Sequence, residues 1–187
     1  MRVVILGCGR VGSTLAAMLA REGHQVSVID RDQEAFDKAS QRLGPDFAQD
    51  TVRGIGIDED ILRQAGIEEA DAFIAVTSGD NTNIVAAQIA QERFRVPKVL
   101  ARVYDPIRAE VYREAGIQTI CTSTLVAGLL HDLLLGRPLR SLQQYLDATS
   151  PDATLRSSEP TPPKATKAEA TSLRSARPPQ GASGVGD

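Results

Sequence analysis

Three glycines near the start of the chain, Gly7, Gly9 and Gly12, constrain its fold more than any other feature. They follow the apolar run 3–6 and precede apolar residues that recur at helical spacing. In such a strand–turn–helix unit, the first glycine permits a tight turn and the second lets the backbone approach a phosphate. The third lets the helix pack closely against the strand. The spacing therefore predicts a Rossmann-type turn in which a helix N-terminus can bind a phosphate.

Short apolar segments alternate with helical patterns as far as residue 135. The expected strands are 3–6, 25–29, a less regular one within 47–53, 72–76, 99–104 and 117–121. The expected helices after the first are 32–43, 58–65, 81–94, 106–115 and 124–135. Strands that are apolar on both faces and separated by helices indicate a parallel sheet covered on both sides. Right-handed crossovers then predict an α/β fold, a Rossmann-type doubly wound parallel sheet in a single domain.

The composition changes sharply near residue 148. The segment 148–187 holds six of the ten prolines and no aromatic residue, so it is expected to be a disordered tail. We therefore divide the chain into a nucleotide-binding domain with its last helix at 1–136, a short extension at 137–147 and the tail. No signal peptide and no apolar run of about 20 residues is visible, which predicts a cytoplasmic protein.

Charge and cysteine content exclude several classes of function. The net charge is −3 and no basic stripe is present, so a nucleic-acid partner is not expected. Cys8 and Cys121 fit neither a metal spacing nor a disulfide framework. His24, His131 and Cys8 are interpreted as structural or solvated residues. No nucleophile–base pair or metal cluster is expected, so no catalytic residue is assigned.

An acid stands at the end of the second expected strand. Asp30 follows Gly12 by 18 residues, which is the position at which a carboxylate accepts hydrogen bonds from ribose hydroxyls and repels a 2′-phosphate. The next residue, Arg31, either lies over an adenine or pairs with a phosphate, and a solvated surface arginine is equally compatible. Together with the glycines, Asp30 predicts a site for a nucleotide.

A second polar group follows the fourth expected strand. Thr77, Asp80 and Asn83 are spaced three apart, and Asp80 and Asn83 would share a helix face at the crevice of the sheet. Asp80 is also a candidate N-cap. Arg102, inside an apolar strand, needs a partner. That partner is either a ligand phosphate or a carboxylate such as Asp80.

The last expected helix is apolar around nearly its whole circumference. A helix of this kind has to be buried on more than one side. The domain can cover one side only, so we expect a second subunit to cover the other. The alternative cover is the C-terminal tail, which is very polar. The apolar residues concerned are Leu125, Val126, Ala127, Leu129, Leu130, Leu133, Leu134 and Leu135.

Taken together, these features resemble the RCK/KTN family, the cytosolic nucleotide-binding domain of Trk and Ktr potassium-uptake systems, with the TrkA proteins as its best-known members. The most specific stretch is DEDILRQAGIEEADAFIAVTSGDNTNIVAAQIAQ at 58–91, and ARVYDPIRAEVYREAGI at 101–117 supports it. The resemblance implies binding of NAD(H), ADP, ATP or AMP without catalysis. It also implies dimers formed through 117–121 and the helix 124–135, which assemble into a ring beneath a membrane potassium channel subunit.

The resemblance also assigns residues by position. By position, the glycines and Asp30 would hold the phosphates and the ribose. Thr77, Asp80, Asn83 and Arg102 would line the crevice. The family often has a Gly-Asp-x-Thr stretch near the adenine, whereas this chain keeps Gly54 and has Ile55 and Ile57 at the Asp and Thr positions. The predicted binding residues are Gly7, Cys8, Gly9, Arg10, Val11, Gly12, Asp30, Arg31, Gly54, Ile55, Thr77, Ser78, Asp80, Asn83 and Arg102.

The sequence therefore predicts a regulatory subunit of a potassium transporter, located at the inner face of the plasma membrane. Two other functions stay open. One is an NAD-dependent oxidoreductase that takes its catalytic groups from a partner subunit. The other is a free-standing nucleotide sensor without a transporter.

Overall fold

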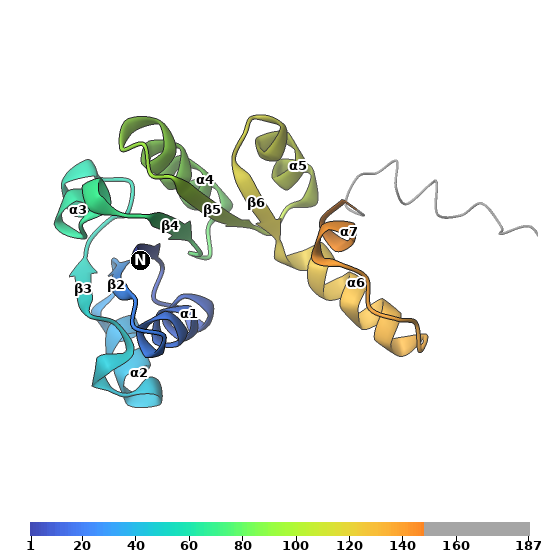
Figure 1. The fold of residues 1–187 in the computed structure, drawn as a ribbon, viewed down its shortest axis with the longest axis horizontal. Coiled ribbons are helices and arrows are strands. Elements are labelled where there is room, and N and C mark those ends of the chain that lie inside the picture. The colour runs from blue at the N-terminus through green and yellow to red at the C-terminus, as the bar shows by residue number, and fades with distance from the viewer. Residues whose placement is uncertain (148–187) are drawn as a thin grey trace, which may run out of the picture.

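The computed structural model describes residues 1–147, which form a six-stranded parallel sheet with helices on both faces (Figure 1). The strand order is β3-β2-β1-β4-β5-β6, so the chain first winds outward from β1 in one direction and then in the other. This order confirms the predicted Rossmann-type doubly wound fold. The strands are β1 (Arg2–Leu6), β2 (Gln25–Asp30), β3 (Asp50–Arg53), β4 (Ala72–Ala75), β5 (Lys98–Val103) and β6 (Gln118–Cys121).

The apolar strands separate two hydrophobic cores, one on each face of the sheet. On β1, Val3 and Ile5 point into the core beneath α1 (Arg10–Arg21) and α2 (Gln33–Leu43). Val4 and Leu6 point into the core on the opposite face. That core is covered by α3 (Glu59–Gln64), α4 (Asp80–Gln88) and α5 (Pro106–Glu114). The alternation along β1 explains why its sequence is continuously apolar.

The predicted element boundaries are correct to within a few residues, with one larger difference. The strand expected within 47–53 is β3, which begins at Asp50 after the 3-10 turn Pro45–Phe47. The helix expected at 81–94 ends earlier as an α-helix, because Ile89–Arg93 widens into a π-helical turn. In that turn the Phe94 amide donates to the Ile89 carbonyl at 3.2 Å, a bond that spans five residues.

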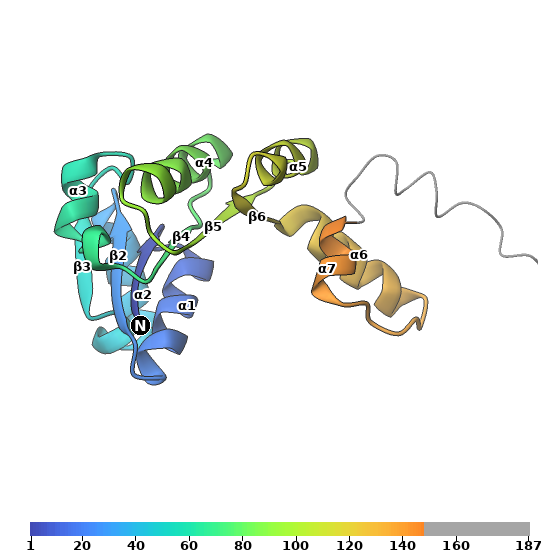
Figure 2. The same cartoon turned by 45° about the horizontal axis from the view of Figure 1, so that its top comes forward.

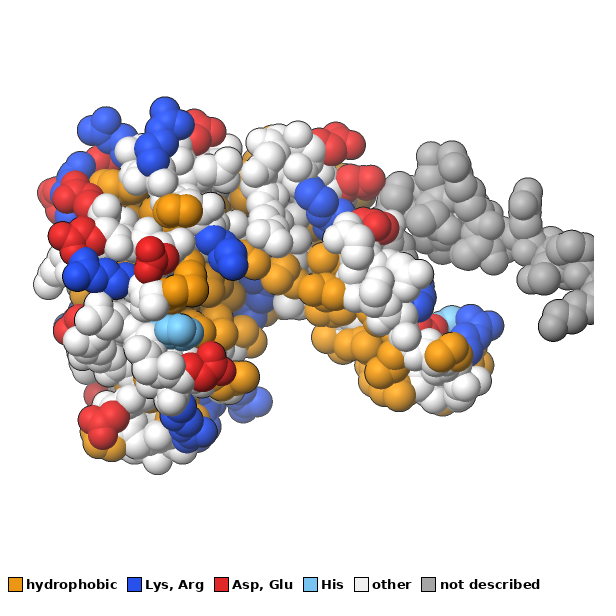
Figure 3. Space-filling view, in the orientation of Figure 1, with side chains coloured by type: hydrophobic (Ala, Val, Ile, Leu, Met, Phe, Trp, Pro, Cys, Tyr) orange, Lys and Arg blue, Asp and Glu red, His pale blue; other side chains and the backbone are white. Residues whose placement is uncertain are grey.

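The last two helices stand apart from the sheet. α6 (Thr122–Leu134) follows β6 directly and extends away from the body, with α7 (Leu142–Asp147) packed along it (Figures 1 and 2). Hydrophobic side chains gather along α6 in the space-filling view (Figure 3). The exposed fractions of Leu130 and Leu133 are each 62%, and that of Leu134 is 84%. Among residues 1–147, α7 packs along one side of this helix, and these three leucines remain exposed.

The contact between α6 and α7 centres on a buried carboxylate. Asp132 is 3% exposed and accepts hydrogen bonds from Arg140 Nε at 2.8 Å and Tyr145 Oη at 2.9 Å. Burial raises the pKa of Asp132, but these hydrogen bonds outweigh it and hold the pKa below its ordinary value. Tyr145 also packs on Gly128, where an added Cβ would lie 2.8 Å from the ring.

The extension predicted at 137–147 thus contains α7, while the domain division at residue 136 stays a prediction. The tail predicted from residue 148 lies outside the described residues. Across residues 1–147, no helix combines the length and the apolarity that a membrane span requires.

Candidate functional site

The glycine turn joins β1 to α1 in a geometry that only glycine fits. Gly7 has a φ of +108°, and a Cβ there would lie 2.9 Å from the Thr77 amide nitrogen of the neighbouring segment. A Cβ on Gly12 would overlap the Gly7 carbonyl oxygen. The first and third glycines therefore have the predicted roles, a tight turn and close packing of the helix.

The N-terminus of α1 is open to a ligand. Gly9 is its N-cap, no side chain caps the helix and its first turn contains no acidic residue. Gly9, Arg10 and Val11 are exposed. Unpaired amides at the start of a helix, together with the positive end of its dipole, favour an anion such as a phosphate.

Asp30 lies beside this turn at the end of β2. Its Oδ2 accepts a hydrogen bond from the Cys8 amide at 2.7 Å, and its Oδ1 accepts one from the Asp32 amide at 3.0 Å. The two bonds fix the carboxylate at the carboxyl edge of the sheet, and each oxygen keeps a further lone pair. Arg31, the neighbouring candidate, is exposed.

The loop after β3 brings two apolar side chains to the same edge. The Gly54 amide donates to the Asp30 carbonyl at 2.9 Å. A Cβ on Gly56 would overlap the side chain of Leu6 at the end of β1. Ile55 and Ile57 flank Gly56 and are 61% and 43% exposed. The loop therefore presents an apolar surface where the RCK/KTN resemblance places polar residues.

Asn83 is fully buried and takes part in hydrogen bonds within the protein. Its Oδ1 accepts from the Thr77 amide at 2.8 Å and the Thr77 hydroxyl at 2.7 Å. Its Nδ2 donates to the carbonyls of Thr77 and Arg102, each at 2.9 Å. Asn83 thus joins the segment after β4 to the end of β5 and fixes the backbone there.

Asp80 has a different role from the N-cap considered above. Gly79 is the N-cap of α4, and Asp80 is the first helical residue. Its Oδ1 accepts from the Tyr104 amide at 2.9 Å and its Oδ2 from the Asp105 amide at 3.0 Å. The carboxylate therefore holds the β5–α5 loop against the start of α4, and the assignment as a cap is wrong.

Arg102 finds its partners in the backbone and in an aromatic ring rather than in Asp80. Its Nη2 donates to the Thr77 carbonyl at 2.8 Å, and its guanidinium lies 4.7 Å from the centre of the Tyr104 ring. Its Nε is buried and has no hydrogen-bond partner among the described residues. The side chain as a whole is half-buried, and its remaining Nη donors can take a ligand phosphate or carboxylate at the crevice.

The cysteine in the glycine turn, Cys8, is buried. Burial, followed by the nearby Asp30 carboxylate, raises the pKa of the Cys8 thiol to about 12. Its Sγ lies 3.7 Å from the Ala35 carbonyl, to which it donates. Such a thiol is protonated at neutral pH and fills space, as predicted. His24 lies beside the amino terminus, and His131 lies on α6, so neither is at the crevice.

The structure thus brings the glycine turn, Asp30, the Gly54–Ile55 loop, Thr77 and Arg102 to one edge of the sheet. Ser78 lies in the exposed loop after β4. The predicted set omits Ser13, which is buried and whose Oγ donates to the Gly9 carbonyl at 2.7 Å. It also omits Gly56. A glycine two residues after Gly54 in RGIGID is the signal that could have identified that position.

The sheet order and the glycine turn at the end of β1 define a domain of the Rossmann class. Comparison with known proteins narrows this class to one family. The model of the TrkA-N domain matches residues 3–123, and the chain belongs to that family.

Curated relatives are named as parts of potassium uptake systems. The chain is 58% identical over 122 residues to the Trk system potassium uptake protein TrkA of Streptomyces coelicolor, a match covering 65% of this chain and 53% of that protein. It is 46% identical over 103 residues to the Halomonas elongata protein of the same name, covering 55% of this chain and 22% of that protein. The chain therefore spans about half or less of these two relatives.

Solved structures share the fold. The RCK domain of GsuK superposes with a TM-score of 0.61 and 26% identity, covering 72% of this chain and 28% of that one. A GsuK structure bound to ADP has a TM-score of 0.58 and 27% identity, covering 71% of this chain and 33% of that one.

Proposed function

We propose that this chain is a nucleotide-binding regulatory subunit of a Trk-type potassium uptake system, which binds NAD(H) or an adenine nucleotide such as ADP, ATP or AMP without turnover. One observation carries the proposal: Asp30 is fixed beside an uncapped helix N-terminus in a chain of the TrkA-N family. The curated names and the ADP-bound GsuK structure support the same function.

In this proposal the phosphates bind the free amides at Gly9, Arg10 and Val11, where the dipole of α1 favours negative charge. The ribose hydroxyls donate to Asp30, whose oxygens each have a spare lone pair. The negative charge of Asp30 disfavours a 2′-phosphate, so NAD is preferred to NADP. The adenine lies against Ile55 and Ile57, where burial of their exposed apolar surface adds affinity without a specific hydrogen bond.

The crevice beyond the phosphates contributes mainly through Arg102. Asn83 and Asp80 use their polar atoms to hold the protein backbone. Arg102 is half-buried and keeps Nη donors beyond its bond to the Thr77 carbonyl, so it is the residue that we expect to meet a phosphate or carboxylate group of the ligand. Thr77 then acts by holding Arg102 through its carbonyl oxygen.

The subunit would act through α6. Its exposed leucines support a homodimer in which α6 packs against its copy, with larger ring-like assemblies built from such dimers. A nucleotide can shift this assembly only by its difference in affinity for two arrangements of it. We place the assembly in the cytoplasm, against the membrane potassium channel subunit at the inner face of the plasma membrane.

A thermal shift panel tests the nucleotide part of this function. Each of NAD, NADH, ADP, ATP and NADP is added at about 100 times the expected Kd, which stabilises a binding protein by about 2.7 kcal/mol. We expect the first four to raise the melting temperature and NADP to have a smaller effect. The absorbance of NADH should stay constant with added small carbonyl compounds. No shift with any nucleotide would contradict binding, and NADH consumption would favour the oxidoreductase.

A further inference from the structure

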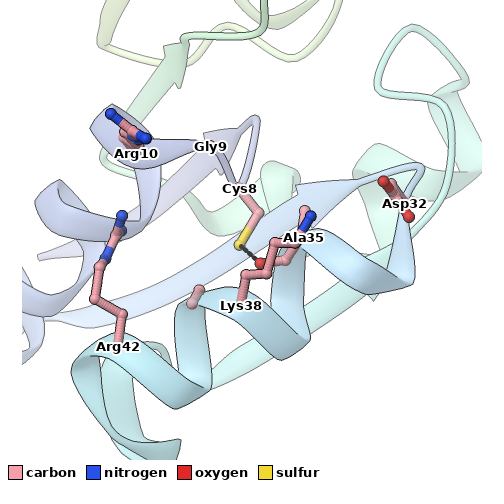
Figure 4. A pocket seen from close by; sticks show the side chains of 8 residues that line it. Cys8, Gly9, Arg10, Asp32, Ala35, Lys38 and Arg42 are labelled. Atoms are coloured by element: carbon pink, nitrogen blue, oxygen red, sulfur yellow. Dashed lines mark hydrogen bonds between the residues drawn. The ribbon is translucent and has the colours of Figure 1, made fainter.

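A hollow of about 250 Å³ lies between the start of α1 and the face of α2 that carries Ala35 and Ala39 (Figure 4). It has an apolar floor and a basic rim. The floor is formed by Cys8, Ala35 and Ala39. The rim carries Arg10, Lys38 and Arg42. None of the α2 residues belongs to the nucleotide site described above.

Arg42 is held in place across the hollow. It extends from α2 toward α1 (Figure 4), where its Nη2 donates to Ser13 Oγ at 2.5 Å. Ser13 is fully buried and its hydroxyl donates in turn to the Gly9 carbonyl at 2.7 Å, so this anchor cannot move freely. A guanidinium has five N–H donors, and this bond leaves others for a ligand. The order of Arg42 therefore lowers the entropy cost of binding an anion.

The charges of the lining favour an anion. Three cations face one carboxylate, Asp32, whose Oδ1 is already engaged by the Glu34 amide at 3.0 Å. Lys38 pairs with Glu34 at 2.8 Å, but both side chains are about two-thirds exposed, so this pair is weak and easily exchanged. The uncapped N-terminus of α1 adds its partial positive charge from Gly9.

We propose that this hollow is a second binding site, adjoining the nucleotide site, for the phosphate group of a small molecule. The phosphate pairs with Arg42, Lys38 and Arg10, and any small organic part lies on the apolar floor. Gly9 and Arg10 border both sites, so two anions bound at once repel one another. Nucleotide and phosphate therefore weaken each other's binding by the same factor, because coupling between two sites is reciprocal.

The test is an amide NMR titration of the full chain with sodium phosphate, against sodium chloride at equal ionic strength. We expect saturable shifts at Ala35, Lys38 and Ala39 that remain, at lower affinity, when ADP is saturating. Glycerol phosphate in place of phosphate distinguishes the sources: tighter binding of the ester indicates a phosphorylated metabolite, and equal or weaker binding indicates free phosphate. ADP binding is measured separately, so the phosphate titration still tests the second site if the nucleotide proposal fails.

Two pairs of substitutions provide the controls. K38Q/R42Q should lower the phosphate affinity at least tenfold, and R21Q/K98Q, which removes two exposed charges elsewhere, should leave it unchanged. If loss of Arg42 unfolds the chain, K38Q alone should still lower the affinity several-fold. Three results would overturn the proposal: equal shifts with chloride, meaning an adventitious ion only; shifts confined to 9–11 that ADP abolishes; or unchanged binding by the folded variants.

Discussion

Asn83 shows how a residue at a binding crevice can serve the protein rather than the ligand. It is fully buried, and all four of its hydrogen bonds go to Thr77 and Arg102. Asp80, one helical turn earlier, likewise uses both oxygens on backbone amides. The motif T-x-x-D-x-x-N is therefore chiefly a device that joins the ends of β4 and β5 and presents Arg102.

Substitution of Asn83 by alanine should be strongly destabilising. It removes four hydrogen bonds and leaves buried backbone groups without partners. We therefore expect a loss of about 2–3 kcal/mol in the free energy of unfolding. Urea denaturation measures this loss. The matched control is Asn81→Ala, because Asn81 is exposed and its side chain accepts a hydrogen bond from the Arg108 side chain at the surface. Equal stability of the two variants would show that the buried network contributes nothing.

Local spacing in the sequence was enough to predict the glycine turn and Asp30, because each role depends on residues of one strand–turn–helix unit. It could not identify the partners of Asp80 and Arg102. Asp80 accepts from two backbone amides and Arg102 donates to a backbone carbonyl, all on neighbouring segments. Ser13 and Arg42 escaped prediction for a similar reason, since 29 residues separate them.

At the scale of elements, α6 and α7 form a helical hairpin with its own polar centre. The strands were predicted well because burial on both faces makes each one a continuous apolar run. The apolar residues of α6 predicted burial on more than one side, yet within one chain its leucines are largely exposed. The short α7 was missed because its partners, Asp132 and Gly128, lie on another helix.

Gly128→Ala tests this hairpin. In most helices glycine to alanine stabilises by about 1 kcal/mol, but here the added Cβ would lie 2.8 Å from Tyr145. The ring must move and weaken its bond to Asp132. We expect hydrogen exchange in α7 to accelerate about tenfold, equivalent to about 1.4 kcal/mol. Val126→Ala, at a half-exposed position elsewhere on α6, should leave α7 unchanged. Slower exchange in the Gly128 variant would contradict this packing.

At the scale of the whole molecule, helices cover both faces of the sheet, whereas much of the apolar surface of α6 stays exposed among the described residues. Three leucines of α6 are more than 60% exposed, and the proposed homodimer rests on this apolar surface. The nucleotide edge and α6 are linked through the β5–α5 loop that Asp80 holds and through β6, which leads directly into α6. In the proposed function, this path connects occupancy of the nucleotide edge to the arrangement of α6 in the assembly.

Leu130→Asp should convert the assembly to monomers. A carboxylate at a position that is 62% exposed in one chain leaves the fold intact but is costly to bury in a dimer. Sedimentation velocity is compared for this variant and for Met18→Asp, at a 54% exposed position on α1. The comparison separates loss of the dimer interface from the general effect of adding a surface carboxylate. The control should sediment as the unmodified chain does. An unchanged oligomer in the Leu130 variant would place the interface elsewhere.

Isothermal titration calorimetry of ADP and NAD against the full chain and its Asp30→Ala variant tests the central claim most directly. Because the proposed function has the ribose hydroxyls donate to this carboxylate, the variant should bind about 10- to 100-fold more weakly. The control is Asp37→Ala, which removes an exposed carboxylate of α2 that accepts only from Gln33. Weaker binding by the Asp30 variant alone is the predicted result, and equal affinity of all three folded proteins would contradict the account.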